Sequence, residues 1–315
     1  MHQIENGLVI KSTGSIIHVK LDSGAIKECK VSGRFRIKDI KNTNPVAVGD
    51  HVQIEIRANE ALGLITEIAP RRNYIIRKSI NLSRQAHIIA SNIDLALIVV
   101  TLKEPRTSTG FIDRFLVTCE AYSIPAYIVL NKTDLYQSKE DIDAWAELQY
   151  TYETAGYEIL PVSAANKQNT EQLLDVMRGK ICLFSGHSGV GKSALVNTLN
   201  PMLNQRIGEI SDVHAKGKHT TTFAELLEIA PDTYIIDTPG IKELGLIDME
   251  KTELDDYFPE IFKYAQDCKY NSCLHENEPG CAVKQAVEDD LIAPSRYVNY
   301  IGMLHSEELQ KKWPS

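Results

Sequence analysis

The feature that most constrains this chain is the pattern Gly186-His187-Ser188-Gly189-Val190-Gly191-Lys192-Ser193. An apolar run that predicts a buried strand precedes it, and helical periodicity follows over Lys192–Leu199. A glycine-rich turn in this context points backbone N–H groups at phosphate oxygens, the lysine reaches the β- and γ-phosphates, and the serine hydroxyl reaches Mg²⁺. The alternative, a plain glycine-rich turn, does not require the lysine and serine. We therefore expect a phosphate-binding loop.

The surrounding sequence predicts the α/β domain that such a loop needs. Strands that are apolar on both faces alternate with amphipathic helices from about residue 92 onward. This alternation is typical of a parallel sheet covered on both sides. The expected strands are 93–101, 126–130, 158–162, 180–185 and 233–236, and the expected helices are 111–123, 138–156, 170–178 and 192–199.

A second motif, Asn131-Lys132-Thr133-Asp134, follows the predicted strand at 126–130. A carboxylate at Asp134 can accept hydrogen bonds from guanine N1–H and the exocyclic amine, and adenine offers neither donor there. The Lys132 stem can lie against the base, and the Asn131 side chain can tie this loop to the phosphate loop. Ser163 and Ala164, after the next strand, supply a companion loop whose backbone faces guanine O6. These residues predict a guanine nucleotide.

A third motif, Asp237-Thr238-Pro239-Gly240, predicts contact with Mg²⁺ through Asp237 and with the γ-phosphate through the Gly240 N–H. Thr220 or Thr221, in the run Gly217–Thr222, can complete the Mg²⁺ shell with Ser193; the sequence leaves the choice open. Ile241, directly after Gly240, cannot orient a water molecule. His219 is the nearest polar candidate for that task, and the alternatives are a surface histidine with no catalytic part or a group supplied by a partner.

The order of these motifs is unusual. Ordinary nucleotide switches of this class place the phosphate loop and Mg²⁺ loop before the base-reading loops, whereas here Asn131 and Ser163 precede Gly186 and Asp237. Joining the old termini and opening the chain elsewhere preserves the site. The order therefore predicts a circularly permuted domain, with the residues beyond 246 attached to the loop that senses the γ-phosphate.

A cysteine and histidine cluster, Cys268-x₄-Cys273-x-His275-x₅-Cys281, lies in the C-terminal part. Thiolates and an imidazole at this spacing suit one tetrahedral Zn²⁺, and four protein ligands leave no open position, so we expect a structural site. The other reading is unpaired surface thiols. The remaining cysteines, Cys29, Cys119 and Cys182, are expected to be buried as small hydrophobic residues.

The N-terminal part predicts a different fold and the place of any polyanion contact. Residues 1–70 contain short alternating strands separated by turns, which favours an OB-type barrel, with an SH3-like barrel as the alternative. The net charge of −8 argues against a general nucleic-acid binder, but basic residues gather at Arg71–Lys78 and at Arg84. Any polyanion contact is therefore expected in the N-terminal third. No apolar run approaches a membrane span and Met1–Gly7 shows no secretory pattern, so we expect a cytoplasmic protein with no membrane partner.

Taken together, these motifs resemble one family, the circularly permuted RsgA GTPases, also called YjeQ or YloQ. The likeness includes Gly33-Arg34-Phe35-Arg36, Val48-Gly49-Asp50, the Gly217–Thr222 run and the Cys₃His spacing. It implies an OB-type β-barrel at 1–70, an α/β circularly permuted P-loop GTPase domain at 71–245 with a basic linker at 71–91, and a helical zinc-binding domain at 246–315. It further implies hydrolysis of GTP to GDP, with Mg²⁺, stimulated by the small ribosomal subunit and its rRNA during late maturation. His219 matches the position that the family is thought to use for hydrolysis. We expect a monomer in solution.

Two other functions remain open on the sequence. One is a nucleotide-gated RNA-binding placeholder with negligible hydrolysis. The other is a P-loop ATPase or small-molecule kinase in which Asn131–Asp134 occurs by chance.

Overall fold

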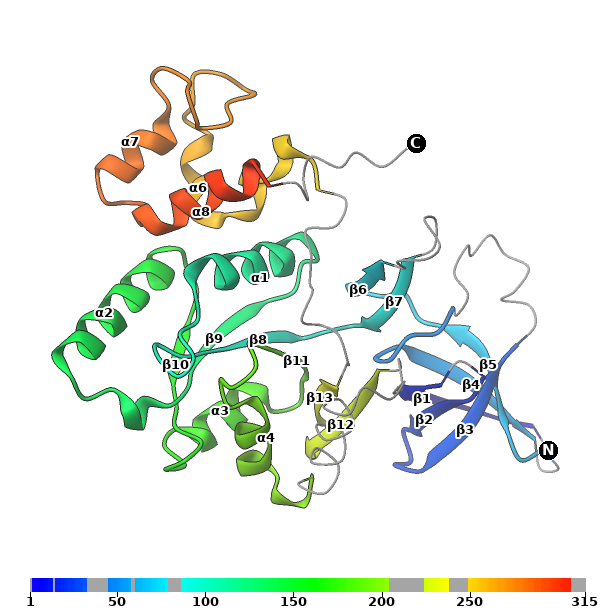
Figure 1. Ribbon diagram of the computed structural model, residues 1–315. Coiled ribbons are helices and arrows are strands. Elements are labelled where there is room, and N and C mark those ends of the chain that lie inside the picture. Colours follow the sequence, from blue (N-terminus) through cyan, green and yellow to red (C-terminus); the bar gives the residue numbers. More distant parts are fainter. Residues whose placement is uncertain are drawn as a thin grey trace. The chain divides into compact units, whose positions relative to one another are not determined.

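The computed structural model describes residues 2–13, 15–32, 45–57, 60–78, 86–203, 224–237 and 249–306. The chain divides into two compact units. Figure 1 labels the helices and strands along the chain. The first comprises Met1–Leu95, Val176–Phe184 and Asn200–Ile241, and the second comprises Ala96–Asp175, Ser185–Leu199 and Lys242–Ser315.

The first unit begins with a closed five-stranded barrel. Its strands run in the order β1-β2-β3-β5-β4, and pairing of β4 with β1 closes the sheet. Inward-facing side chains on alternate positions, such as Val9, Val19 and Ile54, are fully buried. The order and closure confirm the predicted OB-type barrel. The strands are β1 (His2–Ser12), β2 (Ile17–Leu21), β3 (Ile26–Val31), β4 (His51–Arg57) and β5 (Gly63–Ile68).

The segment expected as a basic linker contains an antiparallel ribbon of β6 (Tyr74–Lys78) and β7 (Ala86–Ser91). Arg71 Nε and Nη2 donate to the two carboxylate oxygens of the fully buried Asp50, at 2.7 Å each. Arg72 pairs with Asp94 at 2.6 Å. Both arginines are thus engaged by carboxylates of this chain, whereas the side chains of Arg77 and Lys78, and Arg84 itself, lie outside the described residues.

Three further strands of the first unit are β11 (Ile181–Ser185), β12 (Glu225–Ala230) and β13 (Thr233–Asp237). β11 and β13 pair in parallel, as the alternating pattern predicts. β12 was not expected and runs antiparallel to β13, because the chain reverses tightly at Pro231 and Asp232, where Asp232 has φ 52°. A short helical turn, η3 (Pro201–Leu203), precedes β12.

The second unit contains the parallel strands β8 (Leu95–Val100), β9 (Ala126–Leu130) and β10 (Ile159–Pro161). Every residue of β8 is buried, which explains its continuous apolar sequence. Ser108 caps the N-terminus of α1, and Ser138 forms a capping box with Asp141 at the start of α2. The helices are α1 (Thr109–Ala121), α2 (Lys139–Thr154), α3 (Thr170–Met177) and α4 (Lys192–Leu199), with the turn η2 (Thr133–Leu135).

The C-terminal part of the second unit is helical, as predicted. Its buried core includes Leu254, Phe258 and Ile261, and Val117 of α1 belongs to the same cluster. The helical module therefore packs against α1. Its elements are η5 (Lys251–Glu253), η6 (Asp255–Tyr257), α6 (Pro259–Ala265), α7 (Ala282–Glu288) and α8 (Pro294–Leu304).

Candidate functional site

The predicted phosphate loop lies between β11 and α4, as its sequence requires. Gly186, Gly189 and Gly191 have φ angles of 141°, 87° and 93°, which residues that carry a Cβ rarely adopt. A Cβ at Gly186 would come within 2.4 Å of the Val99 carbonyl oxygen. Lys192 Nζ donates to the carbonyl oxygens of Gly186 and His187, at 2.5 and 2.7 Å, so its ammonium group stays inside the turn.

The base-reading motif is joined directly to the phosphate loop. The Asn131 side chain is buried, and its Nδ2 donates to the Val190 carbonyl oxygen at 2.8 Å. Its Oδ1 accepts from the backbone N–H of Ala164 at 3.1 Å. A single amide therefore connects three loops that are far apart in sequence, which is the link that the sequence predicted for this residue.

The carboxylate of Asp134 is held by the companion loop. Ser163 Oγ donates to Asp134 Oδ1 at 2.5 Å, and the Ser163 hydroxyl also accepts from the N–H of Asn166 at 3.1 Å. Thr133 Oγ1 donates to the Val162 carbonyl oxygen at 3.0 Å. The acceptor of the motif is therefore oriented by neighbours and remains partly exposed, so it can meet a base.

A loop that sequence analysis did not single out contacts both nucleotide loops. Lys132 Nζ donates to the carbonyl oxygen of Glu104, and a Cβ at Gly189 would lie 3.2 Å from Pro105. Thr107 and Thr101 hold the loop closed, because the Thr107 N–H donates to the Thr101 carbonyl oxygen at 2.9 Å. Residues 101–107 thus brace Lys132 and the phosphate loop. Their sequence carries no signal of this role beyond lying between a strand and a helix.

Several predicted site residues are not among those that the structure describes. His219, Thr220, Thr221 and Gly240 lie outside the described residues, as does the Gly33–Arg36 run. Asp237 is the last residue of β13, and its motif predicts that place at the end of a strand. The side chain of Asp237 lies outside the described residues.

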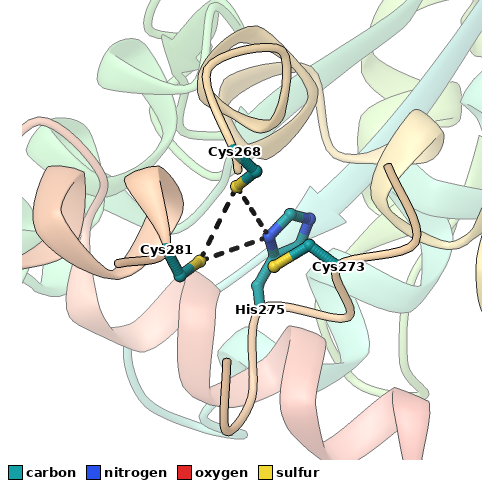
Figure 2. Close-up of side chains that lie close together, drawn as sticks. All are labelled: Cys268, Cys273, His275 and Cys281. Atoms are coloured by element: carbon teal, nitrogen blue, oxygen red, sulfur yellow. Dashed lines mark hydrogen bonds between the residues drawn. The ribbon is translucent and has the colours of Figure 1, made fainter. Parts of the chain in front are cut away.

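The four predicted metal ligands meet in one place (Figure 2). One ligand atom from each of Cys268, Cys273, His275 and Cys281 lies within 4.8 Å of the others. The Cys268 and Cys281 sulfurs are 3.8 Å apart, and His275 Nδ1 lies 3.6 and 3.4 Å from them. Sulfurs bound to Zn²⁺ at about 2.3 Å in a tetrahedron are about 3.8 Å apart, so the donor set and its spacing fit zinc.

The groups around this cluster orient its ligands. His275 Nε2 lies 3.3 Å from Asp255 Oδ2, which leaves Nδ1 to face the sulfurs. Burial acts to lower the pKa of His275, but its contacts with Asp255 and Cys268 together outweigh this and raise the pKa. Burial likewise acts to raise the pKa of Cys268, yet backbone N–H groups of Val283 and Ala282 hold it below its ordinary value, which favours the thiolate.

Glu278 shapes the turn that carries His275, rather than acting as a ligand. Its carboxylate accepts from the backbone N–H groups of Leu274 and Glu276 at 2.9 Å and of Asn277 at 3.1 Å. The bond from Leu274 is the main reason that the pKa of Glu278 is lowered. A charged acceptor at this position keeps the turn between Cys273 and Cys281 closed.

The three remaining cysteines are buried, as predicted. Burial raises the pKa of Cys29 to about 11 and of Cys182 to about 12, and raises that of Cys119 further. These thiols are therefore protonated and unreactive near neutral pH. None of the helices in the described ranges combines the length and apolar character that crossing a bilayer requires.

Known proteins match almost the whole chain. Residues 68–247 match the family described as RsgA GTPase, and residues 6–65 match the RsgA N-terminal domain. The chain is 51% identical over 302 residues to the small ribosomal subunit biogenesis GTPase RsgA of Bacteroides fragilis, covering 96% of this chain and 97% of that protein. It is 53% identical to RsgA 2 of Bacteroides thetaiotaomicron, with the same coverage.

Two solved structures share the fold. The crystal structure of YjeQ from Thermotoga maritima superposes with a TM-score of 0.81 at 34% identity, covering 98% of this chain and all of that one. The structure of YloQ, described as a circularly permuted GTPase, superposes with a TM-score of 0.78 at 29% identity, covering 99% of this chain and 97% of that one.

Proposed function

Because this chain belongs to the RsgA family of GTPases, we propose that it hydrolyses GTP on the small ribosomal subunit during the late maturation of that subunit. The reaction takes GTP and water to GDP and phosphate, and Mg²⁺ would neutralise charge that develops on the phosphates. The subunit and its rRNA stimulate turnover.

The observation that carries this proposal is the bridge made by Asn131. One buried amide contacts Val190 of the phosphate loop and Ala164 of the companion loop. The loops expected to read the base and the phosphates are thereby held in a fixed relation, which a chance match to Asn131–Asp134 would not produce.

The residues divide the work by chemistry. Asp134, positioned by Ser163, accepts from guanine, and Lys132 lies along the base. Lys192 and the N–H groups of the phosphate loop neutralise the phosphates, and Ser193 would hold Mg²⁺ together with Asp237 and either Thr220 or Thr221. The nucleotide set is Asn131, Lys132, Thr133, Asp134, Ser163, Ala164, the loop residues 186–193 and Gly240.

Hydrolysis requires an oriented water molecule. Ile241 cannot orient this water, and His219 is assigned this role because it is the nearest polar candidate, beside Thr220. Stimulation by the subunit follows if rRNA or a ribosomal protein holds His219 beside the attacking water. The N-terminal barrel and the basic segment at 71–91 contact rRNA phosphates, with Arg77, Lys78 and Arg84 as the contributors, since Arg71 and Arg72 are held by Asp50 and Asp94.

Cys268, Cys273, His275 and Cys281 would hold one Zn²⁺. With four protein ligands the ion supplies cross-linking of the C-terminal module rather than Lewis-acid chemistry. Support comes from the tetrahedral spacing of the sulfurs and from the Asp255 contact to His275. We assign the barrel to 1–70, the GTPase domain to 71–245 and the zinc domain to 246–315 of a cytoplasmic monomer.

Competition binding tests the nucleotide assignment. A fluorescent GDP analogue bound to the purified chain should be displaced by unlabelled GTP and left in place by ATP. Equal displacement by ATP would contradict the guanine assignment and favour the ATPase or kinase reading.

A further inference from the structure

A buried charge cluster joins α1 and α2 to the C-terminal helices, and the nucleotide chemistry does not use it. Arg296 of α8 is fully buried. Its Nε and Nη2 donate to the two oxygens of Glu260 in α6, at 2.6 and 3.1 Å, and its Nη1 donates to Asp113 of α1 at 2.8 Å. The guanidinium carbon lies 4.6 Å from the Phe258 ring centre.

Asp113 accepts three hydrogen bonds in this cluster, as many as Arg296 donates. Besides Arg296, it accepts from the hydroxyl of Tyr152 in α2 at 2.8 Å and from Asn299 Nδ2 of α8 at 2.6 Å. Both carboxylate oxygens are thus occupied, and the residue is fully buried. Three donors from two helices fix the position of α1 at this one residue.

Stability alone gives a weak reason for such a cluster. Burying an arginine with two carboxylates costs desolvation energy that apolar side chains of similar volume would avoid. Directional hydrogen bonds fix the rotation and the axial position of a helix more tightly than apolar packing does. The cluster is therefore suited to holding the first turn of α1 in one position.

The first turn of α1 carries Phe111, which contacts the phosphate loop. Phe111 lies two residues before Asp113, about 3 Å along the helix axis. Its ring stacks on His187 of the phosphate loop, with ring centres 3.7 Å apart and planes tilted by 31°. His187 is one of the two residues whose carbonyl oxygens accept from Lys192.

We propose that Asp113, held by Arg296, Tyr152 and Asn299, is a positioning residue for the phosphate loop, because it fixes the first turn of α1 so that Phe111 stays stacked on His187. This inference rests on the nucleotide site proposed above. It makes the C-terminal helices part of the support of that site, because Arg296 and Asn299 both belong to α8.

The chain offers a matched pair of variants. Tyr152 and Tyr157 are both buried, their rings lie 5.8 and 5.6 Å from the Arg296 guanidinium carbon, and each hydroxyl donates to an acid of α1. Tyr152 bonds Asp113, whereas Tyr157 bonds Glu120, which lies about 13 Å along the helix from Phe111. Tyr152→Phe and Tyr157→Phe therefore remove similar hydroxyls at opposite ends of α1.

The experiment measures dissociation of a fluorescent GDP analogue from the full-length chain by stopped flow, with the melting temperature recorded for each variant. Tyr152→Phe should speed dissociation by about threefold to fivefold, the factor expected when one hydrogen bond of about 1 kcal/mol no longer supports the bound state. Tyr157→Phe should leave dissociation unchanged. A purely structural role would lower the melting temperature in both variants and change dissociation equally in both, which would overturn the proposal.

A second comparison tests the route through the stacked rings. Phe111→Leu should itself speed dissociation, and adding Tyr152→Phe should then have no further effect, because both changes act through the same contact. Multiplicative effects would overturn the proposal. Failure of the wild-type chain to bind the GDP analogue would refute the nucleotide site itself, whereas normal binding with equal behaviour of the two tyrosine variants would refute this inference alone.

Discussion

Replacing Asp134 by asparagine tests the base-reading assignment most sharply. The change preserves shape, and the amide oxygen can still accept from Ser163, whose hydroxyl lies 2.5 Å from Asp134 Oδ1. What is lost is a charged acceptor facing guanine N1–H and the exocyclic amine. An asparagine NH₂ group would instead meet the amine donor to donor.

The expected loss follows from the two hydrogen bonds. Each bond to a charged acceptor contributes about 1.5–3 kcal/mol, and because Asp134 is partly exposed we take the lower value for both, about 3 kcal/mol in total. This corresponds to a GTP affinity weakened by about 100-fold or more. Xanthine carries a carbonyl oxygen where guanine has its amine, so the variant should bind XTP more tightly than the wild type does.

The assay is competition of unlabelled GTP and XTP against a fluorescent GDP analogue for the wild type and against labelled XDP for the variant, after direct titration of each label. Asp143→Asn, an exposed acid on α2, serves as the control for loss of one negative charge and should leave GTP affinity unchanged. A loss below about threefold for Asp134→Asn with no gain of xanthine binding would refute the assignment.

Four further predictions concern the metal cluster, the phosphate loop, α2 and the rRNA contact. Cys281→Ser should reduce bound zinc, measured by mass spectrometry, from about one ion per chain to a small fraction and melt the C-terminal helices, whereas Cys182→Ser should retain the metal. Lys192→Ala should weaken GTP binding in calorimetry more than it weakens binding of guanosine, because only the phosphates meet the ammonium. The hydrogen bond from Lys103 lowers the pKa of Asp141 from 3.8 to about 2. The ionised carboxylate therefore adds to the free energy of unfolding in full above about pH 4, and this contribution is lost as the pH falls toward about 2. In urea unfolding, Asp141→Asn should lose less stability than the wild type over that pH range. Raising salt from about 50 to about 200 mM should weaken binding to small ribosomal subunits by about tenfold or more in sedimentation assays, and unchanged binding would refute a phosphate-directed contact.

The parts of the fold that sequence predicted are those governed by local chemistry. Gly186 and Gly191 adopt backbone angles that only glycine accepts readily, and together with Lys192, Ser193 and the flanking strand and helix they identify the loop. Asn131 was expected to tie two loops because its amide can donate and accept at once, and it does so. The four residues of the proposed zinc site were recognisable from residue type and spacing, and their ligand atoms meet in the structure.

What sequence missed depends on contacts between distant segments. Arg296 and Asp113 are 183 residues apart, and neither lies in a pattern that reveals the pairing. β12 was not predicted because it is a short strand that pairs antiparallel with β13, whereas the sequence pattern indicated parallel strands that alternate with helices. Arg71 looked available to a polyanion because the sequence does not show that Asp50 holds it.

The central claim is that this chain is a GTPase activated by the small ribosomal subunit, and turnover tests it most directly. Phosphate release from GTP and from ATP should be measured with and without purified small subunits, using His219→Ala as the hydrolysis-deficient comparison. The account predicts slow GTP turnover that rises strongly with subunits, no ATP turnover, and a variant that binds GTP with wild-type affinity yet does not hydrolyse it. GTP turnover that is indifferent to subunits, or ATP turnover equal to it, would contradict the account.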